Sequence, residues 1–119
     1  MRFVNSIVCI SLVALAACGA SSPKPEARMA SSEGAIRGAE EVGAKTDPRA
    51  SLHLKLAQEE REKALALVKD GDNKQADLML QRAEADAELA VALSRETAAK
   101  ADAEKTLEQV QELKKKAAQ

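Results

Sequence analysis

The sequence has almost no aromatic residues. Its 119 residues include no Trp or Tyr and a single Phe, Phe3, close to the N-terminus. Aromatic cages for cations and stacking platforms for nucleic-acid bases both depend on exposed rings. The sequence therefore excludes these two classes of binding site.

Metal ligands are also scarce. His53 is the only histidine, and the two cysteines, Cys9 and Cys18, both lie close to the N-terminus. A zinc site needs several nitrogen, sulfur or carboxylate ligands in one place, and the sequence offers no second histidine or nearby cysteine to join His53. We predict no metal site and no cofactor. We expect His53 to pack, or to lie partly exposed, on the apolar face of a helix.

Neither sign of charge dominates, since 18 basic and 19 acidic side chains give a net charge of −1. A nucleic-acid interface normally carries a clustered positive excess, so we predict no nucleic-acid partner. Hydrophobic residues make up 45% of the chain, but alanine supplies much of that share. Because each alanine buries little area, we expect one elongated domain with a thin core.

The first residues have the layout of an export signal. Met1-Arg2 is basic, and residues 4–17 are apolar except for Asn5, Ser6 and Ser11. This stretch is shorter than the roughly 20 residues of a membrane span, but it has the length of a signal-peptide core. We therefore expect residues 1–17 to be removed.

The segment Leu15-Ala16-Ala17-Cys18-Gly19 resembles the lipobox of bacterial lipoproteins. The resemblance implies cleavage before Cys18 and attachment of acyl chains, such as palmitate, to that cysteine. The alternative is an ordinary secretory signal whose cleavage site happens to contain a cysteine. Several acyl chains hold a membrane firmly, because each buried CH₂ contributes about 0.8 kcal/mol. Glycine rather than aspartate after the cysteine implies the outer membrane, where the chain would sit on the inner leaflet facing the periplasm.

The mature chain divides into a tether and a helical domain. Residues 18–32 contain Pro23 and Pro25 and show no periodicity, so we expect the lipidated cysteine to be followed by a flexible tether. Residues 33–119 form the predicted domain. Its first helix, over residues 33–42, is short, with Ser32 as the N-cap and Gly43 as the C′ residue.

The two longer helices have clear boundaries. Asp47 as N-cap, Pro48 at the first helical position and Gly71 at the far end delimit the second helix. Asp72 and Gln75 suggest a capping box for the third helix, which runs without Gly or Pro to about residue 117. Arg61 interrupts the apolar stripe of the second helix, and we expect it to pair with Glu84 across the seam between the two helices.

The third helix carries two apolar stripes at heptad spacing. The first stripe consists of Ala76, Leu80, Ala83, Ala87, Ala90, Ser94, Thr97 and Ala101. It matches the second helix in length and predicts an antiparallel helical hairpin. The second seam consists of Leu78, Ala85, Leu89, Ala92, Ala99, Ala103, Thr106, Val110, Leu113 and Ala117. Because a helix with two seams has two neighbours, Leu78, Leu89, Val110 and Leu113 mark a candidate partner-binding surface. The neighbour could be the first helix, a second copy or another protein.

The predicted fold class is all-α: an antiparallel helical hairpin with a long projecting C-terminal helix and a short N-terminal helix. Several segments carry a family resemblance. These are Val42-Gly43-Ala44, Asp47-Pro48, Leu56-Ala57, Lys63-Ala64, Gly71-Asp72 with Ala76, and Ala83-Glu84-Ala85-Asp86-Ala87-Glu88-Leu89-Ala90. Over about residues 34–100 the chain resembles the bacterial domain-of-unknown-function family 4398 (DUF4398), found in small envelope lipoproteins and ahead of OmpA-like domains. The resemblance implies an OmpA- or peptidoglycan-associated envelope role and supplies no activity.

No arrangement of residues predicts catalysis. The acidic pairs Glu59-Glu60 and Asp86/Glu88 are better explained as solvated helix faces, since residues one or two apart on a helix do not face each other. Lys114-Lys115-Lys116 complements the helix dipole or forms an anion-binding tip. We therefore expect no enzyme and no small-molecule substrate. The expected function is a lipid-anchored spacer or adaptor that binds an envelope or cell-wall partner; the alternative is a homo-oligomeric coiled-coil structural lipoprotein.

Overall fold

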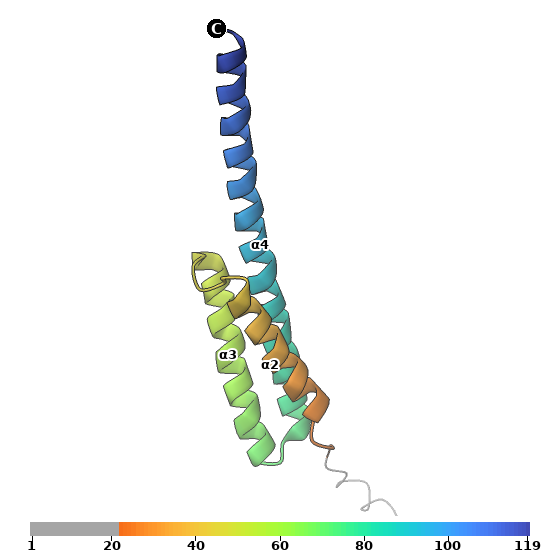
Figure 1. The fold of residues 1–119 in the computed structure, drawn as a ribbon. Coiled ribbons are helices and arrows are strands. Elements are labelled where there is room, and N and C mark those ends of the chain that lie inside the picture. Colours follow the sequence, from red (N-terminus) through yellow and green to blue (C-terminus); the bar gives the residue numbers. More distant parts are fainter. Residues whose placement is uncertain (1–21) are drawn as a thin grey trace, which may run out of the picture.

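The computed structural model describes residues 22–119, which form three helices and no strand. They are α2 (Glu26–Glu41), α3 (Pro48–Lys69) and α4 (Asn73–Ala117). α3 and α4 form an antiparallel hairpin, α2 lies along it, and α4 continues well past the other two helices (Figure 1). The predicted all-α hairpin with a projecting C-terminal helix is confirmed. None of the described helices combines the length and the apolar character that a membrane span requires.

Local signals fix the ends of α3 and α4. The Asp47 side chain accepts hydrogen bonds from the N–H groups of Arg49 and Ala50, and Pro48 occupies the first turn of α3. At the far end Gly71 adopts a φ of 83°, a left-handed conformation that glycine tolerates best. The Asp72 side chain then caps α4 by accepting from the Gln75 N–H at 3.2 Å. The predicted N-caps of both long helices are confirmed.

The same turn differs from the prediction in one detail. The expected capping box had Gln75 reaching back to the Asp72 N–H, but that N–H donates to the Leu67 carbonyl at 2.9 Å. The Gly71 N–H donates to the Val68 carbonyl, so the two bonds form a Schellman motif. The motif leaves no donor at Asp72 for a second partner, and this is why the reciprocal bond is absent.

The core is thin and built mainly of alanine. Its apolar members are Ile36, Ala39, Ala44, Ala50, Leu54, Ala57, Ala64, Ala76, Leu80, Ala83, Ala87 and Ala90. The first stripe of α4 is buried from Ala76 to Ser94, as predicted, and it ends there because Thr97 and Ala101 are exposed. Small side chains at these positions let the backbones of α3 and α4 approach closely.

The first helix is longer than predicted. α2 begins at Glu26, directly after Pro25, so residues 26–32 are helical and do not belong to a tether. Ser32 is not an N-cap: it is fully buried inside α2, and its hydroxyl donates to the Met29 carbonyl. Proline restricts only the residues up to Pro25, and contacts with α4 order the turn that follows. The predicted signal peptide and Cys18 lie outside the described residues.

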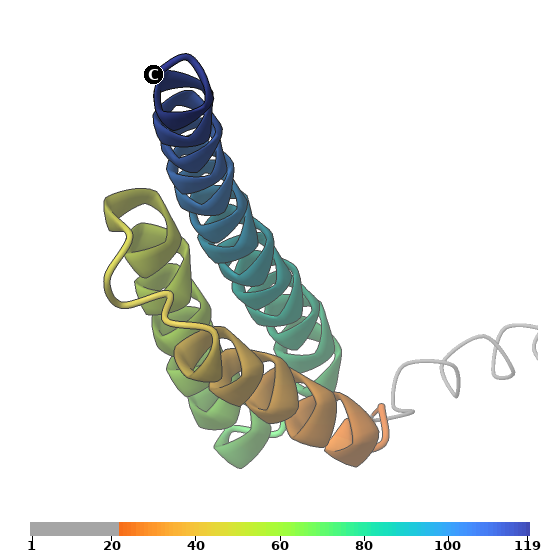
Figure 2. The ribbon, with the colours of Figure 1, turned by 45° about the horizontal axis from the view of Figure 1, so that its top comes forward.

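α2 packs mainly against α4 and less against α3. Its C-terminal end is closed by Gly43, whose φ is also 83°, and the Ala44 N–H donates to the Ala39 carbonyl. In both views α4 extends alone beyond the loop between α2 and α3 (Figures 1 and 2). The last buried residue of α4 is Ser94, and every residue from Thr97 onward is exposed. We call residues 99–117 the arm.

Candidate functional site: the exposed seam of α4

The second seam lies on the surface along the whole of α4. Leu78 is 47% exposed, Leu89 42%, Val110 41% and Leu113 64%. Single exposed leucines are common on protein surfaces, but these four recur at heptad spacing on one helix face. The binding role of this seam stays a prediction, and its exposure is the feature on which we build.

The seam has two parts with different surroundings. Leu78 and Leu89 lie where α4 is flanked by α2 and α3, and a hollow of about 310 Å³ between α2 and α4 reaches Ala92 through Ala35, Gly38 and Val91. Val110 and Leu113 lie on the arm, where α4 has no flanking helix among the described residues. α2 therefore borders the first part of the seam without covering it, and it leaves the second part untouched.

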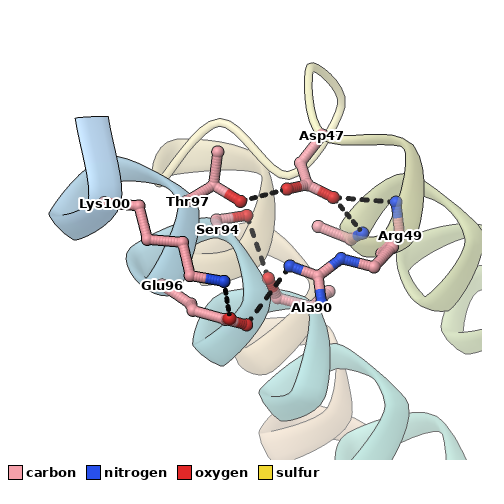
Figure 3. Close-up of polar contacts among 8 residues, drawn as sticks. Asp47, Arg49, Ala90, Ser94, Glu96, Thr97 and Lys100 are labelled. Carbon is pink, nitrogen blue, oxygen red and sulfur yellow. Dashed lines mark hydrogen bonds and ion pairs between the residues drawn. The ribbon is translucent and has the colours of Figure 1, made fainter. Parts of the chain in front are cut away.

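A polar network fixes α3 to α4 where the arm begins (Figure 3). The second oxygen of the Asp47 carboxylate accepts a hydrogen bond from the Thr97 hydroxyl, so one carboxylate caps α3 and contacts α4. The bond from Thr97, followed by that from the Ala50 N–H, lowers the pKa of Asp47 below its ordinary value. Asp47 is therefore charged at neutral pH and fastens the end of α3 to the base of the arm.

A second contact in the same region joins the two helices. Glu96 accepts a hydrogen bond from Lys100, one turn later on α4, and one from Arg49 of α3 at 3.2 Å. These two cations lower the pKa of Glu96, the Lys100 bond having the larger effect. The Ser94 hydroxyl, in contrast, donates to the Ala90 carbonyl at 2.9 Å. Figure 3 shows these polar contacts, which join α3 to α4 and which we call the polar clamp.

The only histidine is paired between α3 and α4. His53 Nδ1 lies 2.7 Å from Asp86 Oδ1, and both side chains are about a quarter exposed. Glu60 is close by on α3, and one of its carboxylate oxygens is buried without a hydrogen-bond partner among residues 22–119. Burial raises the pKa of Glu60, and the negative charge of Asp86 raises it further. Within the described part of the chain no three His, Cys, Asp or Glu side chains are placed to hold a metal ion.

The acidic residues Glu59, Glu60 and Asp86 differ in part from the expected solvated faces. Glu59 pairs with Lys55, the nitrogen and oxygen being 3.8 Å apart. Glu60 and Asp86 face each other across α3 and α4, since the spacing of residues within one helix does not restrict contacts between two helices. Sequence reasoning missed this network because the relative rotation of the helices decides it.

The predicted pairing of Arg61 with Glu84 is wrong. Arg61 Nη2 lies 2.8 Å from Glu33 Oε2 of α2, whereas Glu84 accepts from Arg28 of α2 at 3.1 Å. α2 thus supplies a partner to each residue of the expected pair. Arg28 also lies 3.5 Å from Asp77, and these contacts line the hollow of about 550 Å³ between α2 and α4. The apolar stripes do not specify where α2 packs. The ion-pair partners that α2 supplies to Arg61 and Glu84 could therefore not be predicted from the sequence.

The lysine run ends α4. Lys114, Lys115 and Lys116 are all in its last turn, where positive charge complements the helix dipole. Lys116 also pairs with Glu112 at 2.7 Å, a contact between two exposed residues one turn apart. Lys114 and Lys115 have no ion-pair partner among the described residues.

Comparison with known proteins supports the family resemblance. The family model described as "Domain of unknown function (DUF4398)" matches residues 27–110, which include all of α3 and most of α2 and α4. No curated protein and no solved structure matches the chain. The match extends into the arm as far as Val110, so part of the arm belongs to the shared domain.

Proposed function

The chain belongs to the DUF4398 family, and we propose that it is a non-enzymatic, lipid-anchored envelope protein that acts as a helical spacer or adaptor. Its partner would be another envelope protein, such as one carrying an OmpA-like domain, or a component bound to the cell wall. The family match supplies the helical domain and no activity, so the proposal rests on the chain's own residues.

The observation that carries the proposal is the exposed second seam. The three helices already bury one seam of α4, yet Leu78, Leu89, Val110 and Leu113 remain in contact with solvent. The seam is interrupted by Arg82 and Glu96, but its apolar residues lie on a helix face that the domain does not cover, as on helix-docking surfaces. Ion pairs and helix caps, such as Arg61 with Glu33 and Asp47 at the start of α3, join the helices to one another, and these contacts favour a structural and binding role.

The anchor rests on the lipobox at Leu15-Ala16-Ala17-Cys18-Gly19. Membrane attachment through acyl chains would leave the helices free to extend away from the membrane. α4 alone is about 67 Å long at 1.5 Å per residue over 45 residues. A lipid-anchored domain of this length suits a spacer between a membrane and a partner at some distance from it.

Labelling with palmitate tests the anchor. Cells that express the full chain should incorporate the label into it, Cys18→Ala should abolish incorporation, and Cys9→Ala should leave it unchanged. The Cys9 variant is the matched control, since both substitutions remove one thiol from the N-terminal segment. Equal labelling of the Cys18→Ala chain would disprove lipidation at this residue.

Photo-crosslinking in cells tests the adaptor role. A crosslinking residue in place of Leu89 should capture one specific envelope protein, whereas the same residue at Glu108, exposed on another face of α4, should not. The captured protein is identified by mass spectrometry. If the two positions capture the same set of abundant envelope proteins, the seam has no dedicated partner and the adaptor role is wrong.

A further inference from the structure

The arm of α4 is an amphipathic helix with no packing partner within the described part of the chain. Leu107 is 62% exposed, Val110 41% and Leu113 64%, and no residue after Ser94 is buried. The arm continues a helix that is already packed in the hairpin, so it is not an isolated helix. It therefore presents an apolar face that no described residue covers.

The spacing of the arm is self-complementary in one direction. Its seam residues alternate between two heptad positions: Ala103, Val110 and Ala117 at a, and Ala99, Thr106 and Leu113 at d. When two such helices pair head to tail, an a residue of one lies beside a d residue of the other. A single register then matches all six positions, with Ala99 beside Ala117, Ala103 beside Leu113, and Thr106 beside Val110. Leu113, the leucine of this seam, lies beside Ala103 of the other copy, so large and small side chains interdigitate.

We propose that the arm pairs with the arm of a second copy of this chain as an antiparallel, two-fold symmetric coiled coil over residues 99–117. Each residue pair occurs twice in this two-fold arrangement, so the two arms occupy each other's seams. A third copy therefore has no seam left to bind, and the assembly stops at a dimer. This inference goes beyond the proposed function and does not depend on it, since neither the lipid nor an envelope partner takes part in the contact.

Charge favours this second copy and this direction. Asp102 and Lys116 lie on one flank of the seam, each directly before an a residue, and the proposed register places Asp102 of one copy beside Lys116 of the other. On the other flank Leu107 meets the second copy's Leu107, which covers the apolar side chain outside the stripe. Lys100 faces Lys114 there; Lys100 pairs with Glu96 of its own chain, just as Lys116 pairs with Glu112. A parallel pair would instead bring the lysine-rich last turns of both copies to the same end of the coiled coil.

The base of the arm leaves room for the second copy. The loop before α3 and the end of α2 contact α4 through Ser94, Thr97, Ala98 and Ala101, which line one hollow of about 210 Å³. Ala99 and Ala103 lie on the opposite side of α4, since each residue turns the helix by about 100°. The C-terminal end of the second copy can therefore reach Ala99 without meeting the hairpin.

Cysteine crosslinking of the purified full chain tests the register. Ala103→Cys with Leu113→Cys in one chain should give a disulfide-linked dimer, because the two positions meet twice in the antiparallel pair. Peptide mapping should find the thiol introduced at position 103 of one copy joined to the thiol introduced at position 113 of the other. The unsubstituted chain sets the background from Cys9 and Cys18.

The two single variants should crosslink no more than this background. If Leu113→Cys alone dimerises as well as the double variant, the pair is parallel; if the double variant stays at background, the arms do not pair. Either result overturns the proposal.

A charge exchange tests the same contact without cysteines. Asp102→Lys should weaken the dimer about tenfold in sedimentation equilibrium, because it removes two symmetry-related ion pairs and adds repulsion. Combining it with Lys116→Asp should restore most of the affinity. Glu104→Lys, which makes the same charge change outside the contact, is the matched control. A double variant that dimerises no better than Asp102→Lys contradicts the pairing.

A dimer that forms while the crosslinking residue at position 89 captures no envelope protein would refute the adaptor role and leave this inference intact.

Discussion

Replacing Leu80 by alanine should destabilise the hairpin strongly, because Leu80 is the largest fully buried apolar side chain in an otherwise alanine-rich core. It sits on the first stripe of α4, one turn from Ala76 and Ala83, which are also fully buried. Three lost carbon atoms at about 0.8 kcal/mol each give roughly 2.4 kcal/mol from transfer alone. A partly unfilled cavity adds to this, and we expect a total of about 3 kcal/mol.

A loss of this size is large relative to the stability of a small domain, which is about 5–15 kcal/mol. At about 4–8 °C per kcal/mol, the Tm should fall by roughly 12–24 °C. Circular dichroism against temperature and against urea measures the change. Leu52→Ala is the matched control, since Leu52 is 56% exposed on α3 and its replacement should cost no more than about 0.5 kcal/mol. If the two substitutions cost the same, Leu80 is not enclosed by the three helices.

Three further outcomes follow from the packing and the charges. Ala87→Leu should lower the urea midpoint by an amount equivalent to about 1–3 kcal/mol although it adds apolar surface, because Ala87 is fully buried between closely approaching helices. The raised pKa of Glu60 means that its protonated form favours the fold; the stability it contributes is fully present below the unfolded pKa and is lost as pH rises through the folded pKa. Glu60→Gln should therefore flatten that pH dependence and stabilise the chain at neutral pH, which unfolding measured across pH will check. Arg61→Glu should destabilise the domain, and adding Glu33→Arg should recover stability by double-mutant cycle, since these two side chains pair at 2.8 Å.

Controls for these three differ. Ala85→Leu, on the exposed side of α4, should be tolerated, and equal damage from it would remove the packing argument. A Glu60→Gln chain with an unchanged pH profile would show that Glu60 titrates as it does in solvent. Recovery of the Arg61→Glu variant by Glu84→Arg instead of Glu33→Arg would restore the pairing expected from the sequence and contradict the one seen in the structure.

Much of the candidate site follows from the sequence because one helix carries all of it. Leu78, Leu89 and Val110 lie within about 60° of one another around α4 through the helical repeat alone, and Leu113 lies at the edge of that face. Whether the face stays exposed could not be predicted, because α2 was free to cover it. α2 is ordered from Glu26 and lies beside the seam, near Gly38 and Ala92. The polar clamp at Thr97 was missed because its partner, Asp47, is 50 residues away.

Signals within the sequence were enough to predict the ends of both long helices, the hairpin of α3 and α4, and the extension of α4 beyond that hairpin. Capping by Asp47 and Asp72 and the left-handed turn at Gly71 act within a few residues, and heptad spacing acts along one helix. Only the tertiary structure decided where α2 docks, and with it that Arg61 meets Glu33 while Glu84 meets Arg28. The physical reason is that small alanine side chains allow one helix to pack on another at several rotations. The balance among many weak contacts selects one of them, and no local signal reports that balance.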